Sequence, residues 1–308
     1  MKNRVFINLD SDESIFFSKE LESVKAKSYD ILYPEYKATV LLPVNPEADP
    51  GAETIKYEQY DSVGVAKLIA SYSDDVPRAD VKGKEFRSPV KGLASSFGYS
   101  LQEIRAARMA NKPLEQRKAN AARRAIEIKQ NFIGWFGDTA TGLPGFINHA
   151  NISEYTVPAD GTGSTKTWST KTPDQILRDM NGLANSVFTT TKGVHQPDTM
   201  ILPLDQFALA EVTRVTGINE TVMSFFKRTN PFIKNVEWLN ELDGAGASST
   251  DRFMVYKKDI DMVSLEIPQP FEMLPVQEKG FEFITNCHQR TGGVIIPYPL
   301  SVAFGDGI

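Results

Sequence analysis

Residues 100–137 read SLQEIRAARMANKPLEQRKANAARRAIEIKQNFIGWFG. Ser100 suits the N-cap position of a helix, and Glu103 follows three residues later, so the two can form a capping box. Asn111-Lys112-Pro113 then interrupts the helical pattern, and a proline suits the first turn of a new helix. The stretch therefore predicts a short helix followed directly by a long one.

The long helix is predicted to span about 114–136 and to end at Gly137, which fits a C-cap. Its apolar residues recur at helical spacing and share one face. They are Leu114, Ala121, Ala125, Ile128, Phe132 and Trp135. Alanine dominates the middle of that face, and small side chains allow another backbone to approach closely. We therefore expect this helix to pack on a sheet.

The helical stretch is basic. Eight Lys and Arg residues stand against three Glu between residues 101 and 137, in a chain whose net charge is −5. A solvated helix face explains such a run, and so does a surface turned towards nucleic acid. On the second interpretation, the candidate DNA-facing residues are Arg117, Arg123 and Arg124.

The segment before the helices is predicted to be β-structure. Residues 54–60 alternate polar and apolar side chains, which is typical of a half-exposed strand. A turn-rich acidic stretch, 71–80, leads to a second β-like run, 90–99. We expect the two runs to pair as a long hairpin. An isolated hairpin is only marginally stable in water, so this one needs a surface to lie on.

Residues 173–262 are predicted to form a separate α/β unit. Thr172 is an N-cap, Pro173 takes the first helical position, and Gln175 completes a capping box. Further elements follow along the chain. They are a buried strand at 199–202, a helix at 204–216, a flexible loop at 244–251 and a strand at 252–256. Residues 263–308 return to β-structure.

The chain's 308 residues and 41% hydrophobic content allow a substantial core. Residues 1–35 are polar and mixed, with a short helix predicted at 14–26, so they are interpreted as an arm. The acidic residues near Asp10 break any signal-peptide core, and no apolar run is long enough to span a membrane.

The stretches that come nearest to catalytic or ligand-binding motifs lack required residues. The run Asp160–Thr167 lacks one of the two glycines of a phosphate-binding loop, and the Asp10 region lacks the glycine of a calcium loop. Cys287 is the only cysteine, and its neighbour His288 would point to the opposite face of a strand. The sequence therefore predicts no catalytic residue, no cofactor and no metal site.

Several short motifs occur in an order that is similar to one known family. They are Tyr60-Asp61-Ser62-Val63-Gly64-Val65-Ala66, Asp74-Asp75-Val76-Pro77, Tyr99–Ile104 with Lys118–Arg124, Gly142–Asn148, and Arg290–Val294 with the ending Pro299–Ile308. With the arm, the hairpin, the alanine-rich helix and the α/β unit, they span nearly the whole chain. The sequence resembles the tailed-phage major capsid proteins of the Hong Kong 97-like fold, a fold that encapsulin nanocompartments also use.

The resemblance implies an α+β fold with a set division of the chain. The parts are an N-terminal arm (1–35), an extended loop built as a long β-hairpin (36–92), a peripheral domain (93–155 with 263–308) that holds the spine helix at about 114–136, and an axial domain (170–262). The candidate inter-subunit residues of the extended loop are Tyr57, Tyr60, Asp74, Asp75 and Arg78.

The resemblance also implies a function. The chain would be a non-enzymatic subunit that assembles as pentamers and hexamers into an icosahedral phage head. The head would enclose double-stranded DNA held by non-specific contacts. The implied location is the virion, assembled in the host cytoplasm, and the implied further partners are scaffold, portal and decoration proteins, with no membrane.

Three alternatives remain open at this point. The first is an encapsulin-type shell around protein cargo, which the contents of the particle would distinguish. The second is an enzyme with a site in the axial unit around His195, Asp198 and Asp205. The third is a connector or tail protein, which would form rings or tubes instead of closed shells.

Overall fold

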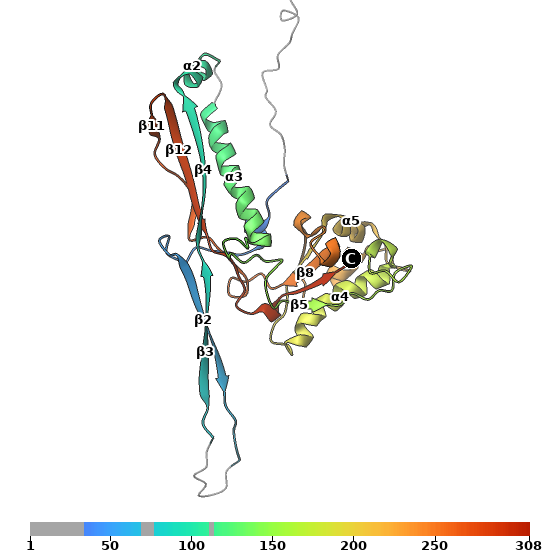
Figure 1. The fold of residues 1–308 in the computed structure, drawn as a ribbon. Coiled ribbons are helices and arrows are strands. Elements are labelled where there is room, and N and C mark those ends of the chain that lie inside the picture. Colours follow the sequence, from blue (N-terminus) through green and yellow to red (C-terminus); the bar gives the residue numbers. More distant parts are fainter. Residues whose placement is uncertain (1–33, 69–76, 111–113) are drawn as a thin grey trace, which may run out of the picture. The chain divides into compact units, whose positions relative to one another are not determined.

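The computed structural model describes residues 34–68, 77–110 and 114–308, with the side chains of Leu114 and Glu115 left out. The chain divides into two units, Met1–Glu35 and Tyr36–Ile308, and the helices and strands shown in Figure 1 belong to the second. The helix predicted at 14–26 lies outside the described residues.

The two consecutive helices are confirmed as α2 (Leu101–Ala110) and α3 (Leu114–Phe136). The capping box at their start is also confirmed, because the backbone N–H of Glu103 donates to Ser100 Oγ and the Glu103 carboxylate accepts from the Ser100 N–H, both at 3.1 Å. Gly137 ends α3 at φ +71°, a left-handed conformation that favours glycine.

The predicted apolar face of α3 is wrong. Ile128 and Phe132 are 45% and 48% exposed, and Ala121 and Ala125 are exposed as well, so only Trp135 of the described members is buried. The buried face instead carries Ala122, Ile126, Gln130 and Ile133. Because Gln130 on this face is polar, the buried positions do not form a continuous row of hydrophobic residues at helical spacing.

Gln130 is buried because its polar atoms have partners. Its amide nitrogen donates to Thr291 Oγ1 at 3.2 Å, and its amide oxygen accepts from Gln289 at 3.5 Å. A buried amide costs little when it is hydrogen-bonded. The helix therefore lies on the sheet through an interface that is partly polar.

A sheet of four strands lies beneath α3, which confirms the predicted helix-on-sheet packing (Figure 1). Its strands are β4 (Lys91–Ser100), β10 (Gln269–Met273), β11 (Gln277–Lys279) and β12 (Glu282–Thr291). β12 pairs antiparallel with β4 along its whole length, from Glu282 opposite Ser100 to Thr291 opposite Lys91. Ala122 and Ile126 of α3 cluster there with Cys287 of β12.

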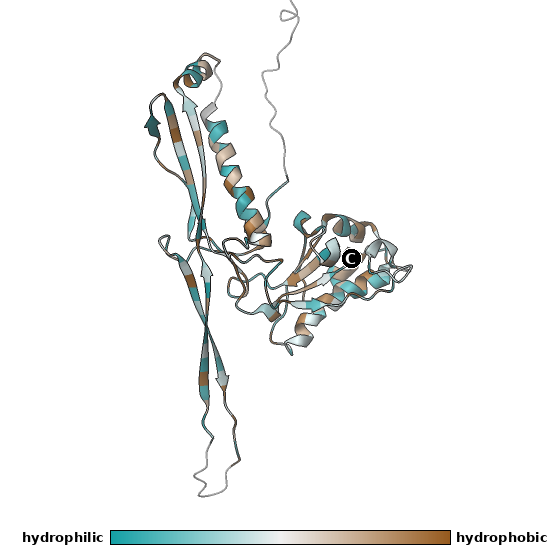
Figure 2. Cartoon of the chain, viewed as in Figure 1, coloured by the Kyte–Doolittle hydropathy of each residue, from teal (hydrophilic) through white to brown (hydrophobic). Residues whose placement is uncertain are grey.

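The hairpin exists, but its predicted partner strand is wrong. β2 (Thr54–Val63) pairs antiparallel with β3 (Asp80–Pro89), from Thr54 opposite Pro89 to Val63 opposite Asp80. The run 90–99 belongs to β4 in the sheet beneath α3. β3 is missing from the predicted elements because half of its residues are charged and its apolar residues do not alternate with polar ones (Figure 2).

The residues before the hairpin belong to a buried junction. α1 (Ala38–Leu41) packs into a core cluster with Trp135 and Phe146. β1 (Val44–Asn45) pairs parallel with β9 (Ser264–Glu266), which pairs antiparallel with β13 (Gly293–Ile295). The hairpin therefore begins at Thr54, inside the segment 36–92 predicted as the extended loop.

A five-stranded sheet forms the core of the second predicted unit, in the order β5-β14-β8-β6-β7. The strands are β5 (Ser153–Tyr155), β6 (Thr199–Leu202), β7 (Asn235–Trp238), β8 (Arg252–Tyr256) and β14 (Ala303–Asp306). The predicted strands at 199–202 and 252–256 are confirmed. β5 and β14 lie in the segments 93–155 and 263–308, which are predicted to form the peripheral domain. β14 nevertheless pairs with both β5 and β8, so both strands belong to the five-stranded sheet.

Helices α4 (Pro173–Thr190), α5 (Leu204–Val212) and α6 (Val222–Thr229) contribute to the core of this sheet region. The Thr172–Gln175 capping box of α4 is confirmed. α5 ends at Val212, short of the predicted 216, because the backbone turns to an extended conformation at Thr213. Short 3₁₀ turns complete the region. They are Trp168–Thr170, Asn240–Leu242, Ala247–Ser249, which lies in the predicted loop 244–251, and Pro299–Ser301.

Candidate functional site

The residues of the enzyme alternative do not form one site. His195 and Asp198 line a cavity of about 400 Å³, whereas Asp205 lines a separate one of about 150 Å³ with Asp243 and Asp251. Asp198 Oδ1 accepts from Thr199 Oγ1 and from the backbone N–H of Lys258, both at 2.8 Å, so this oxygen ties β6 to the end of β8.

The titrating groups in these cavities are shifted without forming a catalytic pair. Burial, and then the charge of Lys257, lower the pKa of His195. The charge of Asp251 is the largest cause that raises the pKa of Asp243. Across the described residues, no group of three or more His, Cys, Asp and Glu side chains is placed to hold a metal ion.

The side chains of Cys287 and His288 do not form a catalytic pair. Cys287 is fully buried, and burial raises the pKa of its thiol. The two residues are neighbours on β12, so their side chains point to opposite faces of the strand. Burial and the raised pKa both make the Cys287 thiol unreactive.

Of the five candidate inter-subunit residues, two lie on the hairpin strands and one lies just before β3. Tyr57 stacks on Phe86 across the two strands, with ring centroids 5.1 Å apart and planes 11° apart. Tyr60 is 66% exposed and donates a hydrogen bond to the Glu58 carboxylate. Arg78 is exposed beside the start of β3. Asp74 and Asp75 lie outside the described residues.

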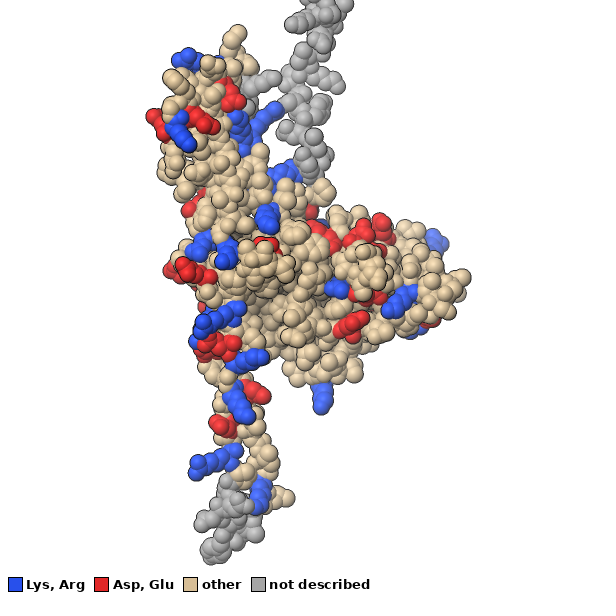
Figure 3. Space-filling view, in the orientation of Figure 1, with Lys and Arg blue, Asp and Glu red and all other residues tan. Residues whose placement is uncertain are grey.

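Charged side chains of both signs alternate along the hairpin (Figure 3). Lys56 forms ion pairs with Glu58 at 2.8 Å and with Glu85 at 2.9 Å. These two carboxylates raise the pKa of the Lys56 ammonium to about 12. Exposed ion pairs contribute little to stability in water. The hairpin is therefore a ribbon with almost no core of its own.

The three candidate DNA-facing arginines on α3 have different neighbours. Arg123 forms an ion pair with Glu127 at 3.5 Å, and its guanidinium lies 5.1 Å from the ring centre of Phe271 on β10. The Arg124 guanidinium lies 5.9 Å from the ring centre of Tyr36. Arg117 is exposed in the first half of α3.

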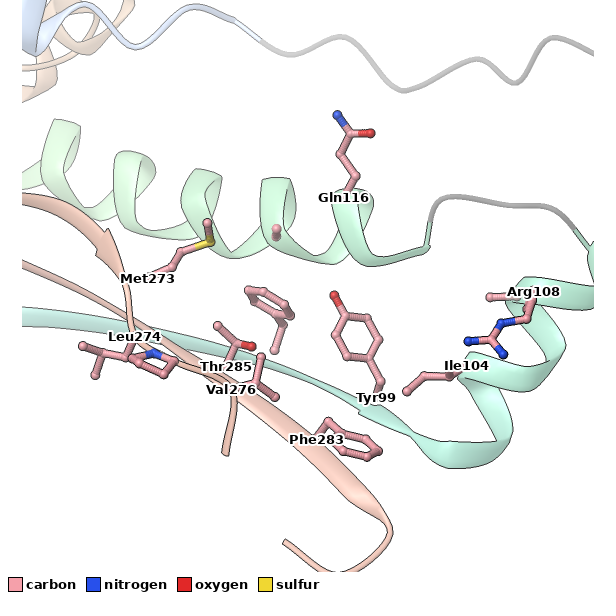
Figure 4. Close-up of a pocket in the computed structure, with 13 residues that line it drawn as sticks. Tyr99, Ile104, Arg108, Gln116, Met273, Leu274, Val276, Phe283 and Thr285 are labelled. Carbon is pink, nitrogen blue, oxygen red and sulfur yellow. The ribbon is translucent and has the colours of Figure 1, made fainter. Parts of the chain in front are cut away.

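A large apolar groove lies between the first half of α3 and the sheet, and no sequence pattern predicted it. It encloses about 940 Å³. Its lining comes from α2, α3, β4, β12, the end of β10 and the connection between β10 and β11. Tyr99, Ile104, Met273, Val276 and Phe283 are among its apolar side chains (Figure 4). The alternation of Phe97 and Tyr99 predicts a strand but gives no sign of a groove.

The root of the hairpin holds a buried carboxyl group. Glu266 of β9 is 3% exposed, and its Oε1 accepts from Ser264 Oγ at 2.6 Å and from Asn45 Nδ2 at 3.2 Å. Burial raises the pKa of Glu266. Close by, Ser88 of β3 donates from Oγ to the carbonyl of Gly292 at 2.9 Å. The Ser88 hydrogen bond attaches β3 of the hairpin to Gly292, directly before β13, and the Glu266 contacts join β9 to β1.

Comparison with models of protein families identifies one family. The model of the Major capsid protein family matches residues 64–308. The fold is similar to the capsid protein of Myoviridae phage XM1, at 16% sequence identity and a TM-score of 0.82, over 96% of this chain and 99% of that chain. No curated protein matches the sequence.

Other solved structures share the fold at lower similarity. A chain from Mycobacterium phage Bobi has 13% identity and a TM-score of 0.63, over 92% of this chain and 94% of its own. The virus-like particle from Pyrococcus furiosus has 12% identity and a TM-score of 0.53, over 86% and 90%.

The described part of the chain contains no helix with the length and apolar character needed to cross a bilayer.

The family match covers most of the chain, including the sheet beneath α3 and the five-stranded sheet. The chain therefore belongs to the major capsid protein family and is a structural capsid subunit with the Hong Kong 97-like fold.

Proposed function

We propose that this subunit assembles as pentamers and hexamers into an icosahedral phage head that encloses double-stranded DNA. The observation that carries the proposal is the β2–β3 hairpin. Tyr60, Val63 and Val81 on it are 66%, 47% and 60% exposed. A two-stranded ribbon of this kind is stable only on another surface, and copies of the same chain supply that surface in a closed shell.

Many modest contacts suit a shell better than one tight interface. Each subunit contributes the hairpin and the edges of its sheets. Contacts made in parallel add up through multivalency, and pairing between subunits covers exposed strand edges. The inter-subunit contacts of the extended loop are proposed to include Tyr57, Tyr60 and Arg78, together with Asp74 and Asp75 of its tip.

The interior of the head is proposed to face the basic side of α3. Arg117, Arg123 and Arg124 would contact DNA phosphates through charge, without sequence specificity. In a chain of net charge −5, such local contacts bind DNA weakly. The closed shell would keep the DNA inside by confinement. Scaffold, portal and decoration proteins are the further partners proposed. Assembly would occur in the host cytoplasm, and the subunit would perform no catalysis.

Expression of the chain followed by light scattering and negative-stain microscopy tests the proposal. Closed shells, or rings of five and six subunits, are expected. A variant whose residues 57–86 are replaced by a short Gly-Ser turn should keep its fold, measured by circular dichroism, and lose the particles. The Val212→Ser variant, altered at an exposed position on α5, serves as the control and should assemble normally.

A second candidate function is a nanocompartment around protein cargo, because a shell subunit can enclose protein as well as DNA. The absorbance spectrum of particles purified from the native host separates the two functions. Nuclease-protected DNA would support the phage head, and a co-purifying protein in its place would support the compartment.

A further inference from the structure

The groove beneath the first half of α3 has the size and the lining of a site for a small apolar ligand. Its volume of about 940 Å³ lies within the range of about 300–1,000 Å³ that is typical of ligand-binding pockets. Apolar and aromatic side chains form most of the lining, and in Figure 4 the Tyr99 ring points from β4 towards the start of α3, with Phe283 beside it. Met273 and Val276 at the margin are each 56% exposed, so this apolar surface is uncovered in the subunit.

The groove exists because small side chains occupy the helix positions that face the sheet. Ala107 of α2 and Ala119 of α3 line it, and neither side chain is large enough to fill the space above β4 and β12. Further along α3, Ala122 and Ile126 cluster with Cys287 of β12, so helix and sheet are in contact there. The groove is therefore a slot that is closed towards the middle of α3 and bordered by α2 at its other end.

One charged side chain lies among the described residues that line the groove. Arg108 of α2 is exposed, and in Figure 4 its side chain extends towards the groove. Within the described part of the chain, its guanidinium takes part in no hydrogen bond or ion pair. Lys118 of α3, by contrast, lies 3.1 Å from the Glu103 carboxylate and donates to the Gly98 carbonyl at 2.7 Å. A guanidinium without a protein partner can bind both oxygens of a ligand carboxylate through two parallel hydrogen bonds.

The scarcity of polar groups in the lining argues against a peptide ligand. Each peptide unit brings an N–H and a C=O group that must be hydrogen-bonded when it is buried. Apart from Arg108, the polar groups of the lining are the side chains of Gln116 and Thr285 and the hydroxyl of Tyr99. So few groups cannot satisfy a buried backbone, whereas a hydrocarbon chain needs no partner. The groove therefore favours a hydrocarbon chain with an anionic group at one end.

We propose that the groove binds a long-chain carboxylic acid, with its hydrocarbon chain between α3 and the sheet and its carboxylate on Arg108. The ligand completes a core that the protein leaves open, because α2 has no buried residue of its own. Bound ligand therefore raises the melting temperature of the subunit. The lining comes from a single chain, so the site does not depend on the proposed shell function.

Isothermal titration calorimetry of the purified full-length chain with decanoate, laurate and myristate tests the proposal, each fatty acid being kept below its micelle concentration. One saturable site per chain is expected. The affinity should rise about fourfold with each added methylene group, because each one leaves water on binding. The absence of saturable binding, or equal affinity for the three chain lengths, would overturn the site.

The role of Arg108 is tested by comparing a charged ligand with an uncharged one of the same length. Arg108→Gln should weaken the binding of laurate about tenfold, because a charge-assisted hydrogen bond is lost, and leave the binding of dodecanol unchanged. Arg105→Gln is the matched control, at an exposed position of α2 outside the groove, and should bind laurate like the wild type. An equal loss for laurate and dodecanol in Arg108→Gln would overturn the assignment of the carboxylate to Arg108.

Filling the groove from within tests where the ligand lies. Ala119→Phe places a ring in the slot and should abolish the binding of laurate, while the melting temperature of the ligand-free subunit stays equal or rises. Ala121→Phe is the matched control, since Ala121 is exposed outside the groove, and it should bind laurate normally. Retained binding by a folded Ala119→Phe variant would place the ligand elsewhere and overturn the proposal.

The same titration on assembled particles tests a competing occupant of the groove. Binding of one laurate per chain is expected in the particles as in the free subunit. Laurate binding that is lost on assembly would show that a second copy of the chain occupies the groove, and this result would also overturn the proposal.

Discussion

The ring of Tyr57 stacks on that of Phe86 across β2 and β3, with centroids 5.1 Å apart. This cross-strand pair is the main apolar contact of a ribbon whose other side chains are mostly exposed. Aromatic pairs contribute about 0.5–1.5 kcal/mol beyond the area that they bury. The pair therefore stabilises the hairpin before any neighbour covers it.

Replacing Phe86 by Ala should loosen the hairpin and leave the rest of the subunit folded. We expect hydrogen exchange of the β2 and β3 amides to accelerate by about 2- to 10-fold, in line with a loss of ~1 kcal/mol. The global melting temperature should change little. Phe86→Tyr keeps the ring and should behave like the wild type. Unchanged exchange in Phe86→Ala would show that the stack does not hold the ribbon.

A buried ion pair should control the stability of the five-stranded sheet region. Lys171 Nζ lies 2.5 Å from Asp179 Oδ2, and both side chains are fully buried. Asp179→Ala leaves a buried ammonium with weaker partners and should lower the free energy of unfolding by about 3–5 kcal/mol. Chemical denaturation measures this loss. Asp174→Ala, at an exposed position in the first turn of the same helix, should cost about 0.5 kcal/mol.

The pH dependence of stability should carry the signature of Glu266. Burial raises the pKa of this carboxyl group in the folded state, so the unfolded chain loses its proton first as pH rises. Folding is therefore penalised increasingly from acidic pH up to the folded pKa, and the penalty is constant above it. Glu266→Gln should raise the melting temperature by a few degrees at neutral pH and leave it unchanged in acid. Equal effects at both pH values would contradict the assignment.

The arginines of α3 should set how strongly the assembled shell holds DNA. Changing Arg117, Arg123 and Arg124 to Gln should weaken binding equally for all sequences and reduce the salt slope by up to about 0.9 per lost phosphate contact. Fluorescence titration of DNA at several salt concentrations measures both. The matched control changes Lys192, Lys227 and Lys234 to Gln, which removes three exposed cations elsewhere. Equal losses in the two variants would refute a DNA-facing role for α3.

The sequence predicted the elements whose signals are local. The capping boxes at Ser100 and Thr172 and the glycine at 137 mark helix ends through hydrogen bonds within a few residues, and the structure confirms all three. The strands at 199–202 and 252–256 are short apolar runs with the same kind of local signature. Such features survive because tertiary contacts reinforce them.

The predictions that failed depend on distant partners. Gln130 lies on the buried face of α3 only because Thr291 and Gln289 satisfy its amide. β3 becomes a strand through pairing with β2, although its own residues show no alternation. β14 joins the five-stranded sheet through β8 and β5, far apart in sequence. The apolar groove likewise arises from elements that meet only in the folded chain.

The size of the assembled species tests the central claim most directly. Native mass spectrometry of the purified full-length chain, combined with electron microscopy of the same sample, measures both the subunit number and the closure of the particle. The account predicts species of five and six subunits and closed shells built from them. A single species of monomer mass at every protein concentration tested would contradict the self-assembly of this chain into pentamers and hexamers.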